Sequence, residues 1–187
     1  MGCSRNISIT GRPNSSYHEL LPSFTREARF FGLEKVRYLT SVTYKSKTLR
    51  EAYVEEYSKK YELSEEEKID LLKKEMEEAD QYDIFLISHY ATDKDTGKLT
   101  KEAKVWDFIL SSNETEGKGS HPDSIKGLMA KDTVLQYFYP QITPWSKVYE
   151  IKFKRGSPVS ELRLKMVGVV DQLSFVWHEK IPDFKEQ

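Results

Sequence analysis

The chain has 187 residues, enough to bury a sizeable core in one domain, and 32% of them are charged. Its formal net charge is −1, so it lacks the basic excess typical of nucleic-acid-binding proteins, and no nucleic-acid partner is expected. No run of about 18 apolar residues occurs, which excludes a transmembrane helix within the printed sequence. A single cysteine excludes an internal disulfide framework and a multi-cysteine metal site.

That cysteine, Cys3, follows a glycine and precedes Ser4 at the very start of the sequence. A glycine before a cysteine also ends a bacterial lipobox, in which the cysteine becomes the acylated N-terminus. Met1 would then be an added start residue, and a signal peptide would precede Gly2. Two alternatives are a chance cysteine and N-myristoylation with neighbouring palmitoylation, although Asn6 replaces the Ser or Thr of the myristoylation motif.

The first 27 residues are rich in Ser, Asn, Pro and Gly, and residues 1–27 are predicted to form a flexible tether. Residues 28–187 are predicted to form one domain. Its first clear strand runs from Glu34 to Lys45, where β-branched and aromatic residues alternate on one face. Leu39 is the one large apolar residue on the opposite face, which is therefore expected to be only partly covered.

Residues 48–81 predict a pair of helices inserted after this strand. Capping-box sequences begin at Thr48 and at Ser64. Helices of this length are marginal alone in water, so their apolar stripes are expected to pack on the β structure. These stripes are Leu49, Tyr53, Tyr57 and Tyr61 in the first helix, and Ile69, Leu72, Met76 and Ala79 in the second.

The rest of the chain predicts strands separated by turns. Asp83–Ala91 is almost continuously apolar at its centre, which is typical of a strand covered on both faces. The pattern also predicts strands at Lys104–Ser111, Val148–Lys154, Glu161–Val167 and Gln172–His178, and a short helix at Thr133–Tyr139. At least six strands with one helical insertion favour an antiparallel β-sandwich, immunoglobulin-like in general plan, with helices on one face or edge.

Motifs for catalysis are absent from the sequence. The four histidines lack metal-site spacing, and no phosphate-binding, nucleophile-elbow or zincin motif occurs, so no metal or cofactor is expected and no catalytic residue is assigned. An alternative hypothesis is an envelope hydrolase with its site on the loops at 92–103 and 112–124. His89, His121 or Asp123 would then take part.

The helical pair is also a candidate partner-binding surface. The segment from Glu62 to Asp80 contains nine acidic residues and only three lysines, whereas residues 147–165 carry a basic excess. The two charged segments could complement each other within one molecule, or the acidic helix could be offered to a basic protein partner. The residues proposed for such a surface are Tyr53, Tyr57, Tyr61, Glu66, Asp70 and Glu77.

Together, the Gly2-Cys3-Ser4 start, the polar tether and the β-rich body resemble uncharacterised cell-envelope lipoproteins of Gram-negative bacteria. The resemblance implies a lipidated Cys3, and Ser4 after it implies sorting to the outer membrane, facing the periplasm. The leading hypothesis is therefore a non-enzymatic, membrane-tethered binding or structural module with a protein partner in the envelope. A soluble cytoplasmic protein with an incidental Cys3 is the other alternative.

Overall fold

The structure is a computed structural model that describes residues 16–31, 36–92, 98–99, 105–112, 119–157, 160–168 and 171–178. Its helices are α1 (Ser16–Phe24), α2 (Lys47–Lys60), α3 (Glu65–Gln81) and α4 (Thr133–Phe138). Its strands are β1 (Thr25–Phe31), β2 (Val36–Tyr44), β3 (Tyr82–Ala91), β4 (Trp106–Ser112), β5 (Ser124–Leu128), β6 (Lys147–Lys154), β7 (Glu161–Gly168) and β8 (Gln172–His178). The chain is therefore mainly β with helices, as the sequence predicts.

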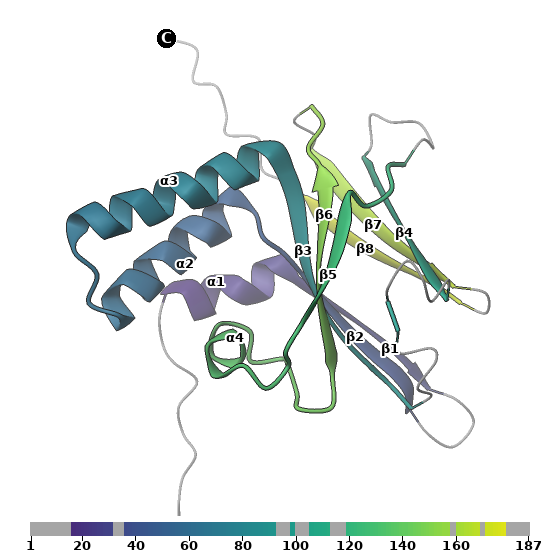
Figure 1. Cartoon of the computed structure of the whole chain (residues 1–187). Helices are drawn as coiled ribbons and strands as arrows, with labels where there is room; N and C mark the ends of the chain where they lie inside the picture. Colours follow the sequence, from purple (N-terminus) through teal and green to yellow (C-terminus); the bar gives the residue numbers. More distant parts are fainter. Residues whose placement is uncertain are drawn as a thin grey trace, which may run out of the picture.

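The strands form two antiparallel sheets (Figure 1). One sheet has five strands in the order β1-β2-β3-β6-β5, and the other has three in the order β4-β7-β8. Side chains from both sheets form one buried cluster, in which the five-stranded sheet contributes Val42, Phe85 and Ile151, and the three-stranded sheet contributes Leu164 and Trp177. The alternation of apolar side chains along each strand supplies this inner face.

Strand β3 is covered on both faces because its apolar residues point to two different clusters. Phe85 and Ile87 enter the cluster between the sheets, whereas Leu86 enters a second cluster on the outer face of the five-stranded sheet. That second cluster also holds Tyr17 of α1 and Leu49 of α2. The prediction of a central strand at 83–91 is confirmed.

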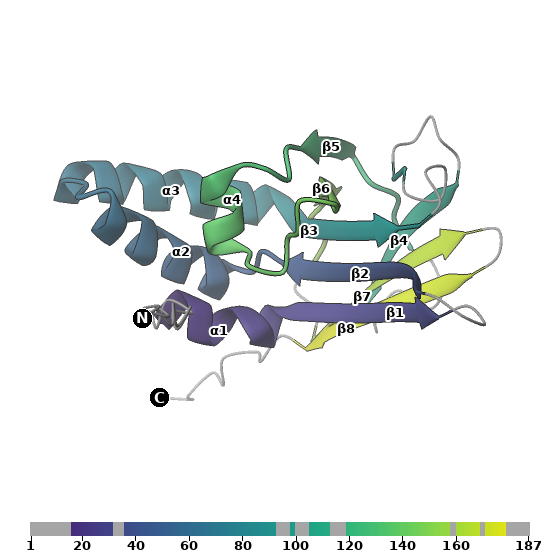
Figure 2. The ribbon, with the colours of Figure 1, turned by 90° about the horizontal axis from the view of Figure 1, so that it is seen from below.

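The helices α1, α2 and α3 lie side by side and extend from one end of the five-stranded sheet (Figures 1 and 2). They cover the outer face only near that end, so the expected packing of α2 and α3 on the β structure is limited to it. The prediction that every residue of the two apolar stripes packs on the β structure also fails in part, because Ile69 is 61% exposed and Tyr61 is 46% exposed. Both residues lie at the ends of the helices that are far from the sheet. The ring centroid of Tyr61 lies 4.4 Å from that of Tyr57, whose side chain covers only part of the Tyr61 ring.

The caps confirm one of the two predicted capping boxes and correct the other. Ser64 and Glu67 form the predicted capping box of α3. In contrast, the N-cap of α2 is Ser46, whose Oγ accepts from the Leu49 amide, and the N-cap of α4 is Asp132. Helix α2 therefore begins at Lys47, before the predicted cap at Thr48, whereas α4 begins at Thr133 as predicted. In both helices a Ser or Asp directly before the first residue satisfies free amides.

The tether predicted over residues 1–27 is wrong for residues 16–27, which form α1 and the start of β1. Tyr17 and Leu21 anchor α1 in the second cluster, and β1 pairs along its whole length with β2. Strand β5 was also missed. It is a short edge strand with the sequence Ser-Ile-Lys-Gly-Leu, in which no residue is fully buried.

Candidate binding groove on the open sheet face

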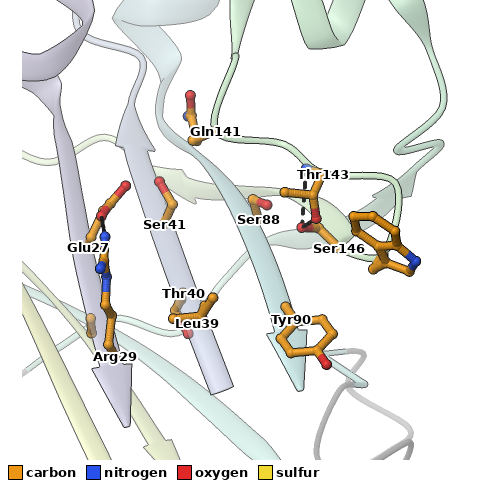
Figure 3. A pocket seen from close by; sticks show the side chains of 12 residues that line it. Glu27, Arg29, Leu39, Thr40, Ser41, Ser88, Tyr90, Gln141, Thr143 and Ser146 are labelled. Atoms are coloured by element: carbon orange, nitrogen blue, oxygen red, sulfur yellow. Dashed lines mark hydrogen bonds and ion pairs between the residues drawn. The ribbon is translucent and has the colours of Figure 1, made fainter. Parts of the chain in front are cut away.

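Beyond the helices, the outer face of the five-stranded sheet carries a groove with a volume of about 260 Å³. Its floor follows from strand register, because Glu27 lies opposite Ser41 and Ser41 lies opposite Ser88. Figure 3 shows these three side chains in a line across three neighbouring strands. Residues directly opposite each other in an antiparallel sheet point to the same face, so pairing alone brings this row together.

A second row lies two residues further along the same strands. Arg29 pairs with Leu39, and Leu39 pairs with Tyr90. Leu39 is 38% exposed, which confirms the prediction that its face is only partly covered. The floor therefore changes from serine hydroxyls in one row to apolar and aromatic surface in the next (Figure 3).

One wall of the groove is the connection between α4 and β6. Thr143 and Ser146 close a turn in which the Ser146 amide donates to the Thr143 carbonyl at 3.0 Å, and their hydroxyls lie 2.8 Å apart. Pro144 occupies the second turn position, where its fixed backbone angle suits a type I or type II turn. The turn presents Trp145, which is 77% exposed although it is among the largest apolar side chains.

This wall is tied to the sheet by a side-chain hydrogen bond. The Gln141 amide nitrogen donates to Thr43 Oγ1 at 3.0 Å, and Thr43 Oγ1 lies 2.9 Å from Thr25 Oγ1. The connection therefore has a fixed position over strands β1 and β2. Trp145 is held beside the groove by a closed turn at one side and by this bond at the other.

The polar groups of the groove have unused hydrogen-bonding capacity. Ser41 is buried, and its Oγ makes no hydrogen bond with any described residue. The Glu27 carboxylate and the Arg29 guanidinium lie 3.1 Å apart but are both well exposed, so their mutual attraction is weak and they can bind other groups. A buried hydroxyl without a partner is unusual and is satisfied by water or by a ligand.

The groove therefore combines an exposed indole, a tyrosine, small hydroxyls and one ion pair. Such a surface can bind a ligand that has both apolar faces and many hydroxyl or amide groups. The histidines are not among its lining residues. His89 is buried on the inner face of β3, where its Nδ1 lies 2.8 Å from Thr40 Oγ1.

None of the residues named for a hydrolase lines the groove at Trp145. His121 Nδ1 lies 3.3 Å from Asp107 Oδ1, and both side chains are exposed. Asp123 lies 3.9 Å from Lys154 instead. Most of the predicted loop at 92–103, and residues 113–118, lie outside the described residues. Within the described ranges, no group of three or more His, Cys, Asp or Glu side chains could hold a metal ion.

The proposed partner surface on the helices divides into two parts. Tyr53 and Tyr57 are half-buried and pack against Phe138 of α4, with ring centroids 4.7 and 6.1 Å away. The acidic members are exposed on α3 and face solvent, namely Glu66, Asp70 and Glu77. The structure therefore does not combine the tyrosines and the acids in one groove, and Cys3 lies outside the described residues.

Part of the acidic helix is neutralised within the molecule. Lys152 of β6 donates to Glu78 of α3, and Arg155 donates to the carbonyl of Ala79 at 2.9 Å. The basic segment at 147–165 therefore contacts the acidic segment within the molecule, at the end of α3 that adjoins the sheet. It leaves only the outer side of that helix available to a partner.

Comparison with protein-family models, curated proteins and solved structures finds no match for this chain. None of the described helices is both long and apolar enough to cross a membrane.

Trp145, Ser41 and Ser88 were not predicted as site residues. The available signal was weak: a tryptophan next to a proline in a polar segment, and one serine in each of two strands rich in apolar residues. Strand register places the two serines side by side, and the turn before β6 brings Trp145 to them, so only the fold assembles the groove.

Proposed function

We propose that this protein is a non-enzymatic binding module that recognises a short glycan in the groove on its open sheet face. The observation that carries the proposal is the exposed Trp145, fixed by a closed turn beside a serine-lined floor. Sugar rings have apolar C–H faces that suit an indole, and their hydroxyls suit Ser41, Glu27 and Arg29. A two-sheet sandwich that presents one open face would be the scaffold for this site.

Glycan binding is expected to be visible in tryptophan fluorescence, because Trp106 and Trp177 are buried and Trp145 is exposed. Titration with linear tetrasaccharides of glucose and of N-acetylglucosamine should shift the emission of the exposed indole to shorter wavelength for at least one of them. Trp145→Ala should weaken binding of that sugar at least tenfold, measured by calorimetry, since the stacking surface is lost.

The matched control is Met129→Ala, which removes an equally exposed apolar side chain that does not line the groove. It should leave the affinity unchanged, and Trp145→Tyr should retain most of it. Equal binding by wild type and Trp145→Ala, or no response to either sugar series, would contradict the proposal.

We further propose that the module is held at the outer membrane of a bacterial envelope through lipidated Cys3, facing the periplasm. The support is the Gly2-Cys3-Ser4 start. One experiment distinguishes this anchor from the alternative of a cytoplasmic protein. The gene is expressed with its native start, and wild type is compared with Cys3→Ser by acyl labelling and membrane fractionation. Wild type should be labelled and sediment with membranes, and Cys3→Ser should be neither. An unlabelled, soluble wild-type protein would disprove the anchor.

A further inference from the structure

A second cavity, of about 200 Å³, lies among the helices at the other end of the outer sheet face. Its deep part is formed by buried residues of three helices, Tyr17 of α1, Leu49 of α2 and Phe138 of α4. Its outer part is formed by the start of α4, where Asp132 and Val134 are exposed to solvent. A cavity of about 150 Å³ already accommodates a benzene ring, so this one has room for a small ring with a polar substituent.

Two polar groups that line this cavity have hydrogen-bond donors without partners. Arg50 is 1% exposed, and its Nη2 makes no hydrogen bond with any described residue. The hydroxyl of Tyr17, which is fully buried, likewise makes none. Four buried side-chain atoms in the described part of the chain have this property, and two of them belong to residues of this one cavity.

The other hydrogen bonds of Arg50 explain why it does not move to find a partner. Its Nε donates to the Lys45 carbonyl at 2.9 Å, and its Nη1 donates to Glu75 at 2.6 Å and to Glu78 at 2.9 Å. The guanidinium plane is fixed by these three contacts. The direction of the free Nη2 is fixed with it, because a guanidinium is rigid and planar.

The acidic residues that line the cavity are already engaged, so donors are in excess there. Glu75 accepts from Arg50, and the Asp132 carboxylate accepts from the amides of Val134 and Leu135 as the cap of α4. Lys45 also lines the cavity, with its Nζ 3.3 Å from Glu150. Burial raises the pKa of the Tyr17 phenol, and the adjacent Tyr139 raises it further, so this hydroxyl stays a donor at physiological pH.

We propose that this cavity binds a small carboxylic acid with an apolar body, such as an aromatic acid. The carboxylate accepts hydrogen bonds from Arg50 and Tyr17, and the ring packs on Leu49 and Phe138. A carboxylate has only acceptors, and charge-assisted bonds to a guanidinium are the strongest hydrogen bonds of this kind. The site is separate from the groove at Trp145 and does not depend on the function proposed for it.

The test uses benzoate and phenylacetate as probes, with benzyl alcohol as a neutral compound of similar shape. Binding is measured by ligand-observed NMR and by shifts of the protein amide signals at neutral pH. Benzoate or phenylacetate should shift amides of α1, α2 and α4, and benzyl alcohol should bind at least tenfold more weakly. Equal binding of the acids and the alcohol, or binding of none, would overturn the proposal.

Two variants locate the site without removing the structural contacts of Arg50. Tyr17→Phe deletes a hydroxyl that has no partner in the free protein, so it should fold normally and bind the acid about tenfold more weakly. Leu135→Trp fills the cavity from α4 and should abolish binding. Trp145→Ala, on the separate groove, should leave acid binding unchanged. Full affinity in both Tyr17→Phe and Leu135→Trp would show that the acid binds elsewhere.

Discussion

Replacing Trp177 with alanine is expected to lower the free energy of unfolding by about 3–5 kcal/mol, the usual cost of removing a fully buried large aromatic side chain. Trp177 is 2% exposed in the cluster between the two sheets. Its Nε1 also donates to the Phe24 carbonyl at 2.7 Å, at the point where α1 becomes β1. The substitution therefore removes packing between the sheets and a bond that connects β8 to the N-terminal elements. Urea denaturation measures the change.

Two variants separate these contributions. Trp177→Phe keeps most of the packing but leaves the Phe24 carbonyl without its donor. It is expected to lower the free energy of unfolding by about 1 kcal/mol. Ser174→Ala, at an exposed position of the same strand, should change stability by less than about 0.5 kcal/mol. If Trp177→Ala cost no more than Trp177→Phe, the indole would not be part of a shared core.

Elements with strong local patterns were predictable from the sequence. Alternation along β2, β6, β7 and β8 locates those strands, and the continuous apolar run locates β3. The Ser64 capping box locates α3, because the box satisfies helix amides within a few residues of chain. These signals are local, so neither the order of strands in the sheets nor the partner of each sheet face follows from them.

The N-terminal elements were not predictable for the same reason. Helix α1 contains Pro22 and is stabilised mainly by Tyr17 and Leu21, whose partners on α2 and α4 are far away in sequence. The polar composition of the segment predicted a tether, and tertiary packing overrides that preference. Strand β1 likewise depends on its pairing with β2 and not on its own charged sequence.

The two candidate sites are still harder to read from sequence. The groove is assembled from β1, β2, β3 and the connection before β6, and the helical cavity from all four helices and the residue that follows β2. Their informative features are an exposed indole and hydroxyl and guanidinium groups without partners, and these depend on burial and geometry. The sequence supplies the residue types, and only the fold shows which of them face a cavity.

Arg50→Ala is expected to destabilise the protein by about 3 kcal/mol, because removing one partner of a buried ion pair leaves the other charges uncompensated. The buried guanidinium holds α2 to α3 through Glu75 and Glu78, whose side chains are 16% and 31% exposed. Thermal and urea unfolding measure the loss. Lys47→Ala, which breaks an exposed ion pair with Asp80 between the same helices, should have a much smaller effect. Equal losses in the two variants would contradict the importance of burial.

The same network predicts how stability depends on pH. Burial alone would raise the pKa of the Glu78 carboxyl, but hydrogen bonds from Lys152 and Arg50 outweigh it and lower the pKa from 4.5 to about 2. A carboxyl whose pKa is lower in the folded state stabilises the protein above its unfolded pKa, and this contribution is lost as pH falls. Stability should therefore decrease between about pH 4.5 and pH 2. Glu78→Gln, which cannot ionise, should be less stable at neutral pH and lose less on acidification. An identical acid dependence in wild type and Glu78→Gln would show that Glu78 is not held ionised by its two cationic partners.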